Sequence, residues 1–450
     1  MKQWISGVAA SLVVLGSAVP MAMAAPNKAA LGSIALNNDT ISQPYTLTKN
    51  GGTYMPVWYV IQALKKAGIQ SKWNGHAWNL TSTNLPTPTT SSTSGSGNVA
   101  VFLNGVQIAT IATVTAKDPA SHGKTAYVDA ESLTSILKQL NITSTASGKA
   151  WNLVTPDIQT LVNAFSNTQA APQSQMTGSE TEDIQLNLTS KGKSDPTFSG
   201  QPTNIDISTN IQVKTGTVDG EKAAYTSITM NLPADLTGVS GSGDDSASAV
   251  PQTIQEYLQG SKLWMNEGNG WTEETADEQL IQSLESQMPG QNMGFSALRQ
   301  IQSSQSGDGY TYTATLDTSS LTKLLAPLLE TVTSTASASG ADTSGVSSSE
   351  MASILSTVLK QLKGSMQITV QPVNGQNVVT SEQLTMDMNL PISSLPIPAG
   401  GTDSSLASDI DSIGLHETMS MNYTYDDSTP FTPPADLNTS SDSTSDTGAQ

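Results

Sequence analysis

Apolar and polar residues alternate over much of the chain after residue 180, which is the pattern of β-strands that bury one face. Asn269-Gly270 is a strong hairpin-turn signal and predicts that Leu263–Met265 pairs with Gly270–Thr272. Alternation of this kind is typical of an antiparallel sheet with one apolar face. The alternating runs lie around 184–188, 205–213, 228–232, 366–370, 384–390 and 419–425.

Helical spacing precedes and interrupts these runs. Apolar residues at 158, 161, 162 and 165 follow Pro156, which predicts an opening helix. We therefore expect an α+β fold in which a large curved antiparallel sheet forms an open half-barrel and helices cover its apolar face. The covering helices are predicted at Glu274–Met288, Leu321–Val332 and Met351–Leu362.

The first third of the chain contains an internal repeat. Ala77-Trp78-Asn79-Leu80 returns as Ala150-Trp151-Asn152-Leu153, and the same offset of 73 residues relates Tyr54 to Tyr127 without a gap. Each copy has the pattern of strand, loop, helix and strand. The stretch 85–98 between the copies is rich in Pro, Thr, Ser and Gly, which predicts a flexible linker.

The first copy resembles a known family. Gly51-Gly52-Thr53-Tyr54-Met55-Pro56 precedes an amphipathic helix, Trp73-Asn74-Gly75 and a closing strand. This order is similar to the copper amine oxidase N-terminal-like (stalk) domain of secreted bacterial proteins. The second copy differs in having Asp129 where Pro56 would fall. The resemblance implies two small α+β stalk repeats, at 25–84 and 99–155, that act as a cell-surface spacer without copper chemistry.

The stretch 156–427 resembles the lipoprotein-carrier half-barrel of LolA-like and LppX-like proteins. The likeness lies in the opening helix, the meander strands, the hairpin from Trp264 to Trp271 and the methionine-rich late strands. Such a fold encloses an apolar cavity, so the resemblance implies a lipid or lipoprotein acyl chain as ligand. The chain lacks the lipobox cysteine of the lipid-anchored members. The residues that we expect to line the cavity are Met230, Trp264, Met366, Met386, Met388, Met419, Met421 and Tyr423.

These side chains also have a plainer interpretation. Methionine is deformable and suits a cavity for variable acyl chains, but it equally fills ordinary protein cores. Trp264 and Trp271 can pack against each other's strands without any ligand. The sequence leaves both interpretations open.

Composition narrows the function classes. Lys and Arg number 19 against 38 Asp and Glu, a net charge of −19, which argues against nucleic acid and against an anionic membrane surface as partners. The chain has no cysteine, which excludes disulfides, thiolate nucleophiles and cysteine-ligated metals. The 3 histidines are far apart in sequence, and no acidic cluster has the spacing of a calcium loop. We therefore expect no metal and no cofactor.

Catalytic motifs are matched only superficially. Ser135 and Lys138 have Ser-x-x-Lys spacing, and Lys214-Thr215-Gly216 resembles another element of serine β-lactamase sites. However, Ser135 lies in the second repeat, and Lys-Thr-Gly follows Ser208-Thr209-Asn210 almost directly on one predicted strand. We therefore expect no catalytic residues and no enzymatic activity.

The N-terminus predicts export. Lys2, the apolar stretch after it and the small residues around Ala24 are typical of a cleaved signal peptide spanning 1–24, with an uncleaved anchor as the alternative. No later stretch is long and apolar enough to predict a membrane span, and 428–450 predicts a disordered tail.

Two functions remain open. In the first, the chain is a secreted, envelope-associated protein that binds an apolar ligand. In the second, it is a structural or adhesion module that binds cell wall or an envelope protein. The scarcity of charged residues, at 13% of the chain, leads to a further hypothesis, tolerance of acid, because few paired carboxylates would be lost on protonation.

Overall fold

The computed structural model describes residues 31–49, 52–83, 85, 87–89, 97–147, 149–194, 203–232, 250–274, 295–317, 357–358, 360–394, 409–425, 431–435 and 437. Of these, 60% lie in strands and 18% in helices. The α+β fold class predicted from the sequence is therefore wrong, and the described part of the protein is mostly β.

The difference has a physical reason in the length of the strands. The alternation predicts strands only where apolar residues are dense, whereas β13 (Ser174–Leu188), β14 (Asn204–Val218) and β23 (Ile410–Thr424) each extend for 15 residues and β22 (Gln376–Pro391) for 16. The helices predicted at 274–288 and 321–332 fall outside the described residues except for Glu274. Of the helix predicted at 351–362, residues 357–358 and 360–361 are described and are helical. Glu274, where the first of them was to begin, ends strand β18 (Thr272–Glu274).

The described residues pack as two compact units that divide between Val162 and Asn163, within helix α4 (Pro156–Ala170). The first unit holds the described residues up to Val162 together with Arg299–Ser303, and the second holds the rest. Each unit is described below by itself.

The first unit contains both repeats and three four-stranded sheets, of order β11-β12-β1-β2, β3-β4-β10-β9 and β5-β6-β7-β8. The first repeat supplies β1 (Ser33–Leu36), β2 (Asp39–Ser42), β3 (Leu47–Lys49), β4 (Gly52–Pro56), α2 (Val57–Lys66), β5 (Gln70–Trp73) and β6 (Ala77–Thr81). The second supplies β7 (Val99–Leu103), β8 (Val106–Ile111), β9 (Thr113–Lys117), β10 (Lys124–Asp129), α3 (Ala130–Gln139), β11 (Thr143–Ser147) and β12 (Ala150–Val154).

The two repeats are intertwined around a local two-fold relation. In the antiparallel pair β4–β10, Met55 lies opposite Val128, the residue 73 positions later. Strand β1 pairs in parallel with β12 of the other repeat, with Ile34 opposite Trp151, and β6 pairs in the same way with β7. Because each repeat completes the other's sheet, their apolar residues form one buried cluster.

The helices of the two repeats occupy equivalent positions but start differently. The side chain of Asp129 caps α3 by accepting a hydrogen bond from the backbone N–H of Ser132 at 2.9 Å, whereas α2 follows Pro56 with no side-chain cap. Both helices bury an apolar stripe that includes Leu64 in α2 and Leu137 in α3. This stripe is the amphipathic pattern that the sequence showed.

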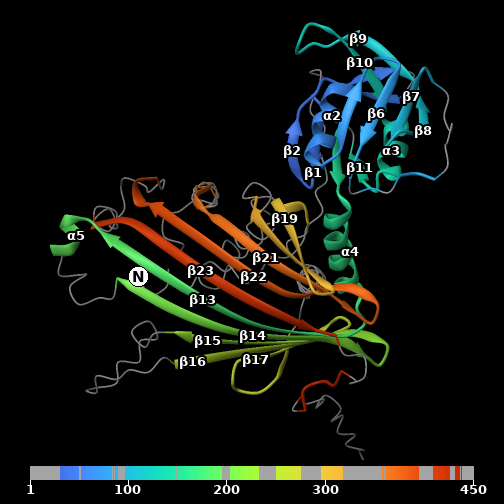
Figure 1. Ribbon diagram of the computed structural model, residues 1–450. Coiled ribbons are helices and arrows are strands. Elements are labelled where there is room, and N and C mark those ends of the chain that lie inside the picture. Colours follow the sequence, from blue (N-terminus) through green and yellow to red (C-terminus); the bar gives the residue numbers. More distant parts are fainter. Residues whose placement is uncertain are drawn as a thin grey trace, which may run out of the picture. The chain divides into compact units, whose positions relative to one another are not determined.

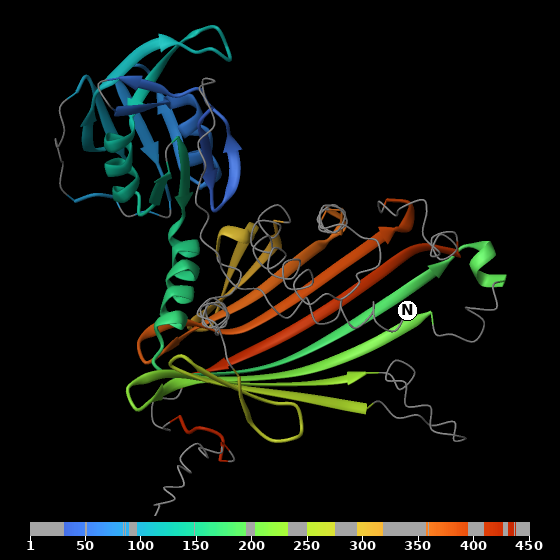
Figure 2. The same ribbon diagram turned by 180° about the vertical axis from the view of Figure 1, so that it is seen from behind.

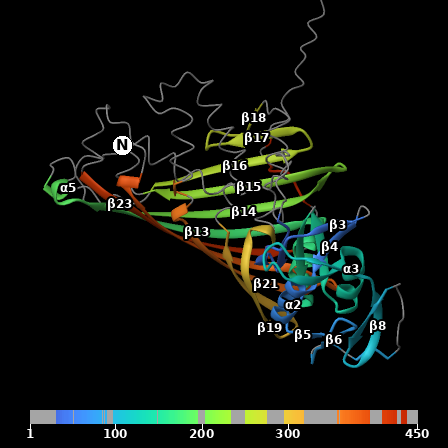
Figure 3. The same cartoon turned by 90° about the horizontal axis from the view of Figure 1, so that it is seen from above.

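The second unit is built on one eleven-stranded sheet of order β18-β17-β16-β15-β14-β13-β23-β22-β21-β20-β19 (Figures 1 and 2). Its first long strand, β13, pairs along its whole length with the last, β23, so the two ends of the meander meet in mid-sheet (Figure 3). The remaining elements are α5 (Ser190–Ser194), β15 (Glu221–Leu232), β16 (Val250–Gln259), β17 (Lys262–Asn266), β19 (Leu298–Ser306), β20 (Gly309–Leu316), β21 (Lys363–Val373) and the short 3₁₀ turns at Phe295–Ala297 and Ile392–Ser394.

Burial alternates along the long strands and defines two faces of the sheet. In the centre of β13, β14, β22 and β23 every second residue is buried or half-buried and the residues between are mostly exposed. We call the face that carries Met176, Ile207 and Met386 the apolar face, and the opposite one the polar face. In the part of the chain that the structure describes, no helix is long and apolar enough to cross a membrane.

Candidate functional site

Four buried glutamates lie on the apolar face, in phase with its hydrophobic residues. Glu180 and Glu182 continue the alternation of β13 from Met176. Glu382 precedes Leu384 and Met386 on β22, and Glu417 lies between Leu415 and Met419 on β23. Because side chains alternate strictly along a strand, the apolar neighbours of each glutamate carry it to the buried face. The exposed fractions are 1% for Glu180, 4% for Glu182, 1% for Glu382 and 0% for Glu417.

Strand register brings three of these carboxyls together. Glu182 lies directly opposite Glu417 across the β13–β23 pair, and Glu180 lies opposite Met419 in the neighbouring position. Directly opposite residues have their Cβ atoms about 5 Å apart, so their side chains touch. We call Glu180, Glu182 and Glu417 the carboxyl cluster. Thr209 of β14, opposite Glu180, and Met386 of β22, opposite Glu417, flank it.

Two members of the carboxyl cluster lack partners. With the carboxyls ionised, none of the oxygens of Glu180 and Glu417 accepts a hydrogen bond from any described residue. An ionised carboxylate without a partner in an apolar interior is very costly, and such groups usually keep a proton instead. The cluster is therefore a site that requires neutralisation.

The pKa values of the three carboxyls are raised because burying their charges is costly. Burial first, and then the charge and hydrogen bond of Glu180, raise the pKa of Glu182 to about 7. The same causes, joined by the charge of Glu182, raise the pKa of Glu417 to about 9. Burial also raises the pKa of Glu180, although hydrogen bonds with Glu417 and Glu182 oppose the rise. These hydrogen bonds exist only when Glu417 and Glu182 carry protons and donate them to Glu180.

The fourth glutamate is satisfied differently. The hydroxyl of Tyr423 donates to Oε2 of Glu382 at 3.1 Å, and both residues are buried. Nearby, the hydroxyl of Tyr425 donates to the carbonyl oxygen of Val379 and contacts Thr168 of α4. Burial first, with a smaller effect of the Glu382 charge, raises the pKa of Tyr425 to about 12. Glu382 is thus held by a hydrogen-bond donor, unlike Glu180 and Glu417.

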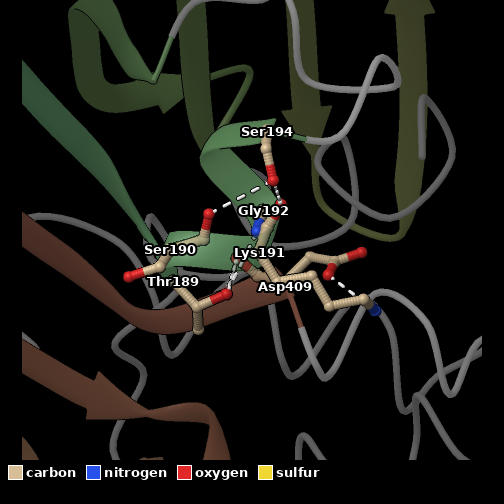
Figure 4. Close-up of polar contacts among 6 residues, drawn as sticks. All are labelled: Thr189, Ser190, Lys191, Gly192, Ser194 and Asp409. Atoms are coloured by element: carbon tan, nitrogen blue, oxygen red, sulfur yellow. Dashed lines mark hydrogen bonds and ion pairs between the residues drawn. The ribbon is translucent and has the colours of Figure 1, made fainter.

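A fifth buried acid in the same unit, Asp409, forms an ion pair. Asp409 is 2% exposed, and its Oδ1 forms an ion pair with Nζ of Lys191 in α5 at 2.9 Å (Figure 4). Thr189 bonds to the carbonyl oxygen of Asp409, and Gly192 packs against its backbone so closely that a side chain would not fit. The short α5 segment therefore supplies a cation to this acid.

The structure places all but one of the expected cavity-lining residues on the apolar face. Met419, Leu384 and Met366 follow one another across three strands in the row that begins at Met230, Thr209 and Glu180. Met386, Met388, Met421 and Tyr423 are on the same face by register. Met366 and Met386 are each 2% exposed, whereas Met230, Met388 and Met421 are only half-buried.

Trp264 lies on the opposite face. It pairs with Tyr257, whose ring centroid is 5.5 Å from its own, and Tyr257 in turn stacks on Phe431 at 6.3 Å. A side chain at Gly216 would collide with Phe431, so the glycine makes room for this ring. Trp264 thus belongs to an aromatic cluster on the polar face, apart from the methionines.

The polar face also carries a groove of about 630 Å³ between β13, β23 and β22. His416 lies there between its cross-strand partners Asp183 and Asp387, and its Nδ1 is 2.7 Å from Oδ1 of Asp387. Gly414, whose cross-strand partners are Gln185 and Asn389, has no side chain to fill the bottom of the groove. Across the described ranges, no group of three or more His, Asp or Glu side chains is arranged to hold a metal ion.

Sequence reasoning missed the carboxyl cluster, although a signal for it was present. The alternating runs predicted at 184–188, 384–390 and 419–425 begin just after the four buried glutamates and do not include them. Each of the four glutamates is nevertheless an even number of residues from the apolar members of its strand, and this phase could have identified them.

Comparisons with known proteins do not identify the chain. No protein-family model matches it, and no curated protein matches it significantly. Among solved structures, the enduracididine biosynthesis enzyme MppR with bound HEPES buffer is 11% identical over 56% of this chain and 86% of that one, with a TM-score of 0.09. A score this low carries no inference about fold or function.

Proposed function

We propose that this chain is an exported, envelope-associated binding protein whose second unit holds the apolar chain of a lipid or of a lipoprotein against the apolar face of its sheet. The observation that carries this proposal is the set of methionines on that face. Met230, Met366, Met386, Met419 and Met421 come from four different strands, yet register brings them to one surface.

Methionine supports such a role because its unbranched, polarisable side chain adapts to ligands of varied shape. Burying an alkyl chain contributes about 0.8 kcal/mol per CH₂ group, so about 12 such groups supply roughly 10 kcal/mol before the entropic costs of binding. The likeness to lipoprotein carriers adds support from the single antiparallel sheet with one apolar face.

Native mass spectrometry of the purified full chain and titration with the uncharged dye Nile red test this proposal. We expect co-purified lipid or saturable dye binding that a Met388→Trp, Met421→Trp double variant abolishes, because both side chains are half-buried on the apolar face. Asn422→Trp, an exposed position on the polar face, is the matched control and should bind normally. Absence of both lipid and dye binding refutes the proposal and leaves a structural or adhesion module.

A further inference from the structure

The carboxyl cluster lies within the face that we propose as the ligand site, so its chemistry bears on the head group of the ligand. The buried acidic and basic side chains on the described strands of the second unit are all glutamates: Glu180, Glu182, Glu382 and Glu417. Glu256, also on this face by register, is half-buried. Lys214, Lys262 and Lys363 are on the polar face by register, and Lys222 is exposed at the β14–β15 turn.

Glu180 and Glu417 stand apart from the other buried acids of this unit. Both are at least nine-tenths buried, and when all three carboxyls of the cluster are ionised none of the oxygens of Glu180 and Glu417 has a hydrogen-bond donor among the described residues. The neighbouring acids of this unit are satisfied, since Tyr423 donates to Glu382 and Lys191 pairs with Asp409. The unsatisfied acceptors are therefore confined to the cluster.

We propose that the carboxyl cluster recognises a cationic head group, an organic ammonium carried by an amphiphilic ligand. This inference rests on the proposed function and adds the class of ligand to it. An ammonium group supplies both the N–H donors and the positive charge that Glu180 and Glu417 lack, and charge-assisted hydrogen bonds are about twice as strong as neutral ones.

The arrangement favours an organic cation over a metal ion. The cluster is spread over adjacent positions of β13 and β23 and does not converge in the way that metal ligands do. Met386 and Met419 lie opposite Glu417 and Glu180, so thioethers and methylenes border the charges on the side of β22 and β23. The ammonium group of an alkylammonium matches the carboxyls, and its alkyl chain matches the apolar side chains beside them. A fatty acid would instead bring a further negative charge to three carboxyls.

Isothermal titration of the full chain with dodecylammonium and dodecanoate, both below their micellar concentrations and in 0.3 M NaCl, tests the inference. The two probes share one alkyl chain and differ in head-group charge. We expect dodecylammonium to bind at least about tenfold more tightly. A Glu180→Gln, Glu417→Gln double variant should lose this preference and still bind the alkyl chain, because Gln keeps the shape of Glu without the charge.

The control must exclude general attraction of a cation to a chain of net charge −19. An Asp183→Asn, Asp387→Asn double variant removes the same charge from the polar face and should keep the preference. Equal binding of both probes, or a preference that the Glu180 and Glu417 substitutions leave unchanged, overturns the inference while the proposed function stands. Binding of neither probe overturns both. Circular dichroism checks the folding of each variant. If the double variant unfolds, Glu182→Gln alone replaces it and should reduce the preference for dodecylammonium.

Discussion

Removing one buried carboxyl should change how the stability of the protein depends on pH. Glu182 is the suitable position because it is 4% exposed and lies beside two other acids. Its pKa is raised from 4.5 to about 7, with burial as the main cause and the charge of Glu180 as the next. Substitution with Gln removes the ionisation and preserves the size and shape of the side chain.

The sign follows from linkage. A carboxyl whose pKa is higher in the folded state binds its proton more tightly there than in the unfolded chain. Its contribution to stability is therefore fully present below about pH 4.5 and is lost as the pH rises through about 7. A shift from 4.5 to about 7 corresponds to at most about 3 kcal/mol. This is a large share of a typical total stability of about 5–15 kcal/mol.

Urea unfolding at intervals between pH 4 and pH 9 measures the effect. We expect the free energy of unfolding of the wild type to fall across this range, and Glu182→Gln to fall less, so that the variant is the more stable protein at pH 8. Glu267→Gln, at an exposed position in the turn after β17, should follow the wild-type curve. If the wild-type curve is flat or rises, or if Glu182→Gln runs parallel to it, the reasoning about the carboxyl cluster is refuted.

Three further substitutions test other parts of the fold by their unfolding free energies. Asp129→Ala removes the N-cap of α3 and should cost about 1 kcal/mol. Tyr423→Phe leaves buried Glu382 without its hydroxyl donor at 3.1 Å and should cost about 1–3 kcal/mol. Gly216→Ala should push Phe431 off its aromatic neighbours, lowering stability by about 1–3 kcal/mol and changing the near-ultraviolet circular dichroism.

Each of these has a control of matched chemistry. Glu131→Gln changes an exposed acid in the same helical turn as the cap, and Tyr310→Phe removes a half-buried tyrosine hydroxyl from β20. Gly270→Ala tests a glycine whose added Cβ meets no other atom but whose φ of 98° favours glycine, so it should lower stability without the aromatic signal. Costs for Asp129→Ala and Tyr423→Phe no greater than those of their controls, or an unchanged near-ultraviolet signal for Gly216→Ala, would contradict the assigned contacts.

The sequence predicted those parts of the fold that depend on local periodicity. The methionine-rich alternation of β22 and β23, and the helical stripes of α2 and α3, are all readable within about a dozen residues. The pairing of β13 with β23 cannot be predicted from local periodicity, because it joins residues more than 200 positions apart, such as Glu182 and Glu417. The carboxyl cluster depends on that pairing, so residue type and spacing alone could not assemble it.

The hypothesis of acid tolerance now has two physical bases that differ in their predictions. A low density of charges makes stability insensitive to pH, because few ionic interactions are lost on protonation. The carboxyl cluster makes stability increase toward acid, because Glu182 and Glu417 fold best with their protons in place. If the cluster dominates, the wild type gains stability below neutrality and a variant with Gln at both positions loses most of that gain. A wild type with no slope would leave the low charge density as the only basis for acid tolerance.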